Sequence, residues 1–217
     1  MTVRLAVFDC DGTLVDGQAA VCNAMDAAFA GAGLTLPDRH AVRRAVGLSL
    51  PQAIRLLMPQ ADEAVRAEVD RLYRDAFRQT RESGALVEPL YDGIAQLLAS
   101  LSGEGWTLGV ATGKSDRGLS HCLANHGLSA LFATLQTADR HPSKPHPAML
   151  EAAMDDCLAL PADTVMIGDT QYDIAMARTI GVRAIGVDWG YHTPDELIAA
   201  GADAVASSPA HLKELLS

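Results

Sequence analysis

The sequence predicts an α/β protein, in which a doubly wound parallel sheet carries an all-helical segment inserted after its first strand. Three observations predict this class. Short, continuous apolar runs recur along the chain, and such runs are typical of parallel strands covered by helices on both faces. Helical periodicity fills the intervals between these runs from Leu90 to the end. From Val15 to Gly84 no convincing strand occurs, and helical periodicity stands alone.

The expected strands, in chain order, are residues 4–8, 107–111, 131–135, 164–167 and 184–187, with the third the weakest. Apolar residues three and four apart predict helices around 94–101 and 150–157. In the inserted segment, the same spacing predicts one helix around 21–29 and another around 65–77. Residues that favour turns interrupt the chain between those two helices: Pro37, Gly47, Pro51 and Pro59.

The composition bounds the class of protein. A chain of 217 residues forms one large domain, or a core with a small insert. A net charge of −10 argues against nucleic acid and anionic membranes as partners. No stretch approaches the roughly 18 apolar residues that span a bilayer, and the N-terminus lacks the features of a secretory signal. The 4 cysteines have no metal-binding spacing, which suits free thiols in a reducing compartment. We therefore expect a cytoplasmic protein, as a monomer or a homodimer.

The first strand ends in two carboxylates one residue apart, Asp9 and Asp11, and Gly12 and Thr13 then turn the chain away. Residues two apart on a strand point to the same side, so the two carboxylates are expected side by side. Such close like charges disfavour each other's ionisation unless a cation or a shared proton compensates. The arrangement suits a nucleophile beside an acid–base group, or a site for a hard metal ion. Cys10, between them, is expected to point the opposite way, into the core.

Two further segments carry groups that can bind phosphate, although Thr-Gly after a strand is also common in turns. Thr112 and Gly113 follow the strand at 107–111, and a hydroxyl with a following glycine can hold a phosphate oxygen through the side chain and the backbone N–H. Lys144 stands in a Lys-Pro-x-Pro segment, where two prolines fix the backbone that carries the ammonium. A lysine beside Asp9 would neutralise both the nucleophile and an incoming phosphate.

The fourth segment follows the strand at 164–167, which ends in Gly168 and Asp169, with Asp173 four residues later. If a helix begins there, both carboxylates face the same way. Asp173 has an alternative interpretation as an N-terminal helix residue favoured by the helix dipole.

In their chain order, the four segments resemble the motifs of the haloacid dehalogenase-like superfamily, whose phosphatases read DxDGT, a strand ending in Thr or Ser, KPxP and GDxxxD. The resemblance covers essentially the whole chain outside the inserted segment. It implies a Rossmann-like core at residues 1–15 and 85–217, and a helical cap domain at residues 16–84.

The resemblance also implies a phosphatase that works through an aspartyl-phosphate. Asp9 is the implied nucleophile. Asp11 is the implied acid that protonates the leaving group, and then the base that activates water. The implied phosphate-binding groups are Thr112, the amide of Gly113, and Lys144.

Mg2+ is the implied cofactor. Its implied ligands are an oxygen of Asp9, the backbone carbonyl of Asp11, and Asp169. Asp173 would be a further ligand, or would orient the water shell of the metal or Lys144.

These motifs do not specify the leaving group. Arg43, Arg44 and Gly47 in the inserted segment are the expected contacts, because arginines near a glycine-containing loop can meet a carboxylate or a second phosphate. The alternative is that both arginines lie on a solvated helix face. The pattern after the first motif resembles the phosphoglycolate phosphatase-type hydrolases, which implies a small phosphorylated metabolite as substrate.

Other activities stay open. A β-phosphoglucomutase-type mutase shares the core and cap, but its GxSR loop is absent because Leu50 follows Ser49, and residues 17–25 contain no His. A pyrophosphatase of the same fold is another alternative, as is a non-catalytic binding protein on this scaffold. A dehalogenase is disfavoured, because that subgroup lacks the second Asp of the first motif, and Asp11 is present.

Overall fold

The computed structural model describes residues 3–217, and across them one parallel sheet of six strands has the order β3-β2-β1-β4-β5-β6. The strands are β1 (Leu5–Phe8), β2 (Thr107–Thr112), β3 (Phe132–Thr137), β4 (Thr164–Gly168), β5 (Arg183–Val187) and β6 (Ala204–Ala206). The doubly wound α/β class is confirmed, with strands at all five predicted places. The sequence does not predict β6, because an Ala-Val-Ala run is too short to stand out from the helices beside it.

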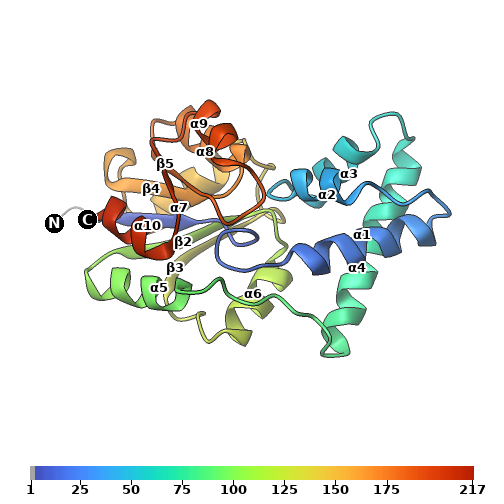
Figure 1. The fold of residues 1–217 in the computed structure, drawn as a ribbon, viewed down its shortest axis with the longest axis horizontal. Coiled ribbons are helices and arrows are strands. Elements are labelled where there is room, and N and C mark those ends of the chain that lie inside the picture. Colours follow the sequence, from blue (N-terminus) through green and yellow to red (C-terminus); the bar gives the residue numbers. More distant parts are fainter. Residues whose placement is uncertain (1–2) are drawn as a thin grey trace.

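Helices cover both faces of the sheet (Figure 1). On one face pack α5 (Ile94–Gly103), α6 (Asp116–Asn125) and α10 (Pro209–Leu216). On the other pack α7 (Ala148–Cys157), α8 (Gln171–Thr179) and α9 (Pro194–Ala199). A short 3-10 helix, Pro161–Asp163, precedes β4. Over residues 3–217, no helix is both long and apolar enough to cross a membrane.

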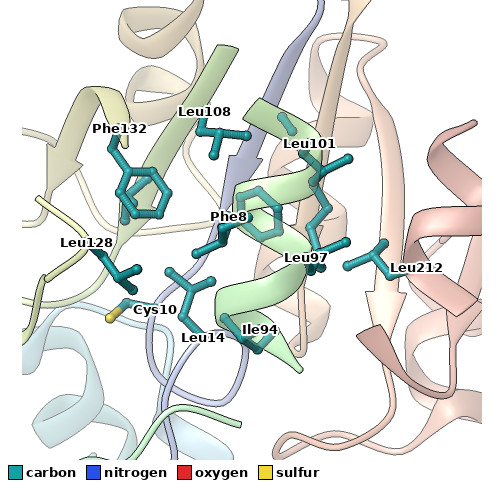
Figure 2. Close-up of a cluster of buried hydrophobic side chains, with 14 of the residues drawn as sticks. Phe8, Cys10, Leu14, Ile94, Leu97, Leu101, Leu108, Leu128, Phe132 and Leu212 are labelled. Atoms are coloured by element: carbon teal, nitrogen blue, oxygen red, sulfur yellow. The ribbon is translucent and has the colours of Figure 1, made fainter. Parts of the chain in front are cut away.

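The apolar core between the sheet and the helices α5, α6 and α10 holds β1 in place. Figure 2 shows Phe8 at its centre, with Leu97 and Leu101 of α5 on one side and Leu108 of β2 nearby. Phe8 is completely buried, and replacing such a residue by Ala costs about 3–5 kcal/mol. As predicted, the side chain of Cys10 points into this core. The core thus fixes the strand end from which Asp9 and Asp11 emerge.

Four helices form the insert between β1 and α5, which we call the helical insert (Figure 1). They are α1 (Gln18–Gly31), α2 (Arg39–Ala45), α3 (Leu50–Leu57) and α4 (Glu63–Glu82), and they share an apolar cluster of their own. The periodicity predicts α1 and α4 but not the two short helices. Pro51, interpreted as an interruption, lies in the first turn of α3, where its missing N–H costs nothing. Asp38 caps α2 by accepting hydrogen bonds from the backbone of His40 and Ala41.

The segments through which the chain enters and leaves the helical insert lie side by side. Val15 bridges to Leu90 in antiparallel fashion, and the N–H of Asp16 donates to the carbonyl of Pro89 over 2.8 Å. The sheet order places β1 between β2 and β4, and the connections between strands run to opposite sides of β1. Ligands of doubly wound sheets bind at such a switch point, beyond the carboxyl ends of the strands.

Candidate active site

The two carboxylates after β1 lie at this switch point. Asp9 is 1% exposed and Asp11 is 8% exposed. The turn after them needs Gly12, whose φ of 86° favours glycine, and a Cβ there would lie 2.2 Å from Oδ2 of Asp169. Gly12 therefore lets the strand ends of β1 and β4 approach each other closely.

Lys144 lies between carboxylates from two different strand ends. Its Nζ is 3.0 Å from Oδ1 of Asp9 and 2.5 Å from Oδ1 of Asp173, and its side chain is fully buried. Burial lowers the pKa of Lys144, but Asp173 and Asp9 raise it, and the balance keeps it above its usual range. Lys144 is therefore a fixed positive charge beside Asp9.

The residues after β4 complete the cluster. Asp169 accepts hydrogen bonds from the hydroxyl of Thr13 and from the N–H of Tyr191, both over 2.9 Å. Asp173 is the third residue of α8 and forms a capping box with Thr170. The side chain of Asp173 thus both caps α8 and pairs with Lys144, and its part in a metal site stays a prediction.

Asp9, Asp169 and Asp173 offer carboxylate oxygens within 4.8 Å of one another. Oδ2 of Asp9 is buried and has no hydrogen-bond partner among the described residues. Burial raises the pKa of Asp9 to about 7, although Lys144 opposes it, and burial also raises the pKa of Asp169. A hard cation would offset these charges, and carboxylate oxygens are its preferred ligands. The donor set fits Mg2+.

Thr112 and Gly113, at the end of β2, line the same cavity as Asp9. Thr112 is buried, and its hydroxyl accepts a hydrogen bond from the N–H of Lys114. A Cβ at Gly113 would lie 2.5 Å from the carbonyl oxygen of Leu48, so glycine lets the helical insert approach β2. Gly47, beside Leu48, also lines the cavity.

A second buried lysine, Lys114, is not among the predicted site residues. Nζ of Lys114 lies 3.0 Å from Oδ1 of Asp11 and 2.5 Å from Oε1 of Glu88. Burial raises the pKa of Asp11, whereas Lys114 lowers it. Lys114 directly follows the predicted Thr-Gly turn, so the sequence places it beside the expected phosphate-binding groups. Its partner Glu88 is distant in sequence and could not be predicted from that turn. The carboxylate of Asp11 thus faces Lys114, while its predicted metal contact is through the backbone carbonyl.

A cavity of about 460 Å3 lies between the strand ends and the helical insert. Gly47 lines it, but in the part of the chain that the structure describes Arg43 and Arg44 do not. The guanidinium of Arg44 makes two hydrogen bonds, over 2.6 and 2.7 Å, to Glu196 of the core, and a substrate contact from Arg43 or Arg44 stays a prediction. The arginines that do line the cavity are Arg74, Arg78, Arg81 and Arg117.

A family model described as haloacid dehalogenase-like hydrolase matches residues 6–187. The chain belongs to this family. The order of its motifs and the convergence of their residues at one sheet edge agree with that membership. As a member of the haloacid dehalogenase-like hydrolases, the protein is an enzyme of the hydrolase class.

Relatives within the family are similar over most of the chain. "Probable phosphatase IndB" of Dickeya dadantii is 41% identical over 202 residues, which cover 90% of this chain and 86% of the relative. The phosphoglycolate phosphatase of Vibrio vulnificus is 29% identical over 223 residues, which cover 99% and 96%. Among solved structures, a predicted phosphatase from Clostridium acetobutylicum has a TM-score of 0.89 at 26% identity, with 100% and 99% of the two chains covered.

Proposed function

We propose that this hydrolase is a Mg2+-dependent phosphatase that hydrolyses a small phosphomonoester through an aspartyl-phosphate on Asp9. The observation that carries the proposal is the setting of Asp9. One of its oxygens lies against Lys144, the other has no partner among residues 3–217, and the residue lines a cavity with Thr112. The relatives named phosphatases support the same activity.

Asp9, Asp169 and the backbone carbonyl of Asp11 would hold the metal, with Asp173 beside them. When bound, Mg2+ offsets the negative charge of the carboxylates and of the transferred phosphoryl group. The unpartnered oxygen of Asp9 and the raised pKa of Asp169 support a cation at this place.

In the first step, a carboxylate oxygen of Asp9 bonds to phosphorus while the bond from phosphorus to the leaving oxygen breaks. Asp11 gives its proton to that oxygen. In the second step, Asp11 takes a proton from water as the water oxygen bonds to phosphorus and the bond from phosphorus to Asp9 breaks. Burial raises the pKa of Asp11, which favours the protonated form that the first step needs.

The ammonium of Lys144, the hydroxyl of Thr112 and the N–H of Gly113 would bind the oxygens of the transferred phosphoryl group. Charge spreads over these oxygens in the transition state, so positioned donors lower the barrier most there. The burial of Lys144 and Thr112 supports this role, because a buried donor is already fixed in direction.

The helical insert, within the predicted cap at residues 16–84, would close over the site and contact the leaving group. Its support is the cavity itself, which is lined by both the strand ends and helices of the insert. Phosphoglycolate is the reference ester against which other substrates are compared, because a relative whose alignment covers 99% of the chain has the name phosphoglycolate phosphatase.

The test is phosphate release from a panel of phosphoglycolate, hexose phosphates, nucleoside monophosphates and pyrophosphate, with Mg2+. We expect turnover of at least one ester by the wild type and its loss in Asp9→Asn, with unchanged circular dichroism. Near-normal turnover by Asp9→Asn would refute the assignment of the nucleophile.

A further inference from the structure

We infer that the substrate's leaving group is larger than glycolate, has an apolar or aromatic body, and carries a carboxylate that Arg81 binds. This inference rests on the proposed phosphatase function and adds the class of substrate. Three features of the cavity support it: its volume, the apolar part of its wall, and one arginine that has no ion pair within residues 3–217.

The volume exceeds what a two-carbon leaving group needs. Phosphoglycolate has about nine non-hydrogen atoms, which would fill less than about 270 Å3 even at the ~30 Å3 that one water molecule occupies. The cavity holds about 460 Å3. Volumes of roughly 300–1,000 Å3 are typical of sites for larger organic ligands.

Part of the cavity wall that the helical insert supplies is apolar. Val21 and Met25 lie one turn apart on α1, and Tyr73 and Phe77 lie one turn apart on α4. The two aromatic rings have centroids 5.1 Å apart. An apolar or aromatic body placed against these side chains would remove apolar surface from water, whereas a two-carbon acid is too small to cover them.

Arg81 differs from the other arginines of the cavity. Arg74, Arg78 and Arg117 are each about half exposed or more, and each pairs with a carboxylate of α4. Arg81 is half-buried, and within residues 3–217 it forms no ion pair, while its Nε is buried without a hydrogen-bond partner. A buried donor without a partner is rare, and its usual explanation is a ligand or ordered water.

The chemistry of Arg81 suits an oxyanion, and we assign it a carboxylate. A guanidinium binds a carboxylate through two parallel N–H donors, and Nε is one of the donors that this arrangement uses. Its single positive charge, which has no ion pair within residues 3–217, matches the one negative charge of a carboxylate, whereas a second phosphate would bring a charge of about −1.5 to −2. The phosphate end of the substrate is already served by Lys144 and Thr112 near Asp9.

The test uses two aryl phosphates of the same size, 4-carboxyphenyl phosphate and 4-carbamoylphenyl phosphate. The first carries a carboxylate where the second carries a neutral amide. We expect the wild type to prefer the carboxylate about tenfold to a hundredfold in kcat/KM, mostly through KM. We expect Arg81→Gln to lose this preference and Arg81→Lys to keep part of it. Arg71→Gln is the matched control, because Arg71 lies on α4 but is exposed and paired with Glu68.

Three results would overturn the inference alone: equal use of the two aryl phosphates by the wild type, an unchanged preference in Arg81→Gln, or a higher kcat/KM for phosphoglycolate than for 4-carboxyphenyl phosphate. In each of these the proposed phosphatase function stands, because phosphate is still released. Release of phosphate from none of the three esters or the wider panel would overturn the proposed function and this inference together.

Discussion

The most informative perturbation of the site is the removal of the buried charge of Lys144. Replacing Lys144 by Met keeps the length of the side chain but leaves Asp9 and Asp173 without the ammonium that lies 3.0 and 2.5 Å from them. Breaking a buried ion pair by removing one partner costs about 3–5 kcal/mol, because the remaining charge is buried without compensation. For a domain of this size, that loss lowers Tm by roughly 6–20 °C.

The loss should depend on pH in a defined direction. Burial raises the pKa of Asp9 to about 7, so at about pH 5.5 Asp9 is largely neutral with or without Lys144. At about pH 8 the wild type holds an ionised Asp9 beside Lys144, and the variant must bury that charge unpaired or bind a proton. We therefore expect the full loss of about 3–5 kcal/mol near pH 8 and a smaller loss near pH 5.5.

The assay is urea denaturation followed by circular dichroism at both pH values, with chelator present. Lys213→Met is the control, because Lys213 is 42% exposed and its pair with Glu104 should contribute less than about 1 kcal/mol. A loss below about 1 kcal/mol for Lys144→Met near pH 8, or a larger loss near pH 5.5, would refute the description of a charged, buried cluster.

Three further predictions concern the metal, the pH dependence of stability and the contact between the core and the helical insert. Excess chelator should stop phosphate release and added Mg2+ should restore it; undiminished activity in chelator would remove the metal from the proposal. The free energy of unfolding of the metal-free protein should decrease as pH rises from 3.8 through about 7, because folded Asp9 keeps a proton that the unfolded chain releases. Calorimetry should show a weaker pH dependence for Asp9→Asn, and an equal dependence would count against the raised pKa. Arg44→Ala should cost about 1 kcal/mol or less, because Arg44 and Glu196 are 25% and 38% exposed, and should change kcat/KM less than threefold or so. A much larger loss of activity would indicate that Arg44 contacts the substrate.

Much of the candidate site is predictable because its polar side chains follow the carboxyl ends of strands. Parallel strands bring their carboxyl ends to one edge, so Asp9, Thr112 and Asp169 converge although they are far apart in sequence. The family resemblance and the strand pattern therefore predict both the sheet and the convergence of these three residues. Short elements such as β6 and α2 escape prediction, because three to seven residues carry too little periodicity.

The contacts between the core and the helical insert were not predictable in this way. Arg44 and Glu196 are 152 residues apart, and only the packing of the insert on the core brings them together. The same packing places Arg81 at the cavity wall, although the sequence of α4 alone predicts only a helix with one charged face. Which arginine faces a ligand depends on the orientation of a whole helix, and a single sequence does not encode that orientation in any local pattern.

The most direct test of the central claim is to locate the phosphoryl group on the enzyme. Asp11→Asn should accumulate the aspartyl-phosphate from an aryl phosphate with Mg2+, because an aryl leaving group needs little protonation while the attacking water still needs a base. After an acid quench, peptide mass spectrometry should find an alkali-labile phosphate adduct on Asp9, and none in the Asp9→Asn, Asp11→Asn double variant. An adduct on another residue, or a burst of released phenol equal to the enzyme concentration with no adduct on Asp9, would contradict the account.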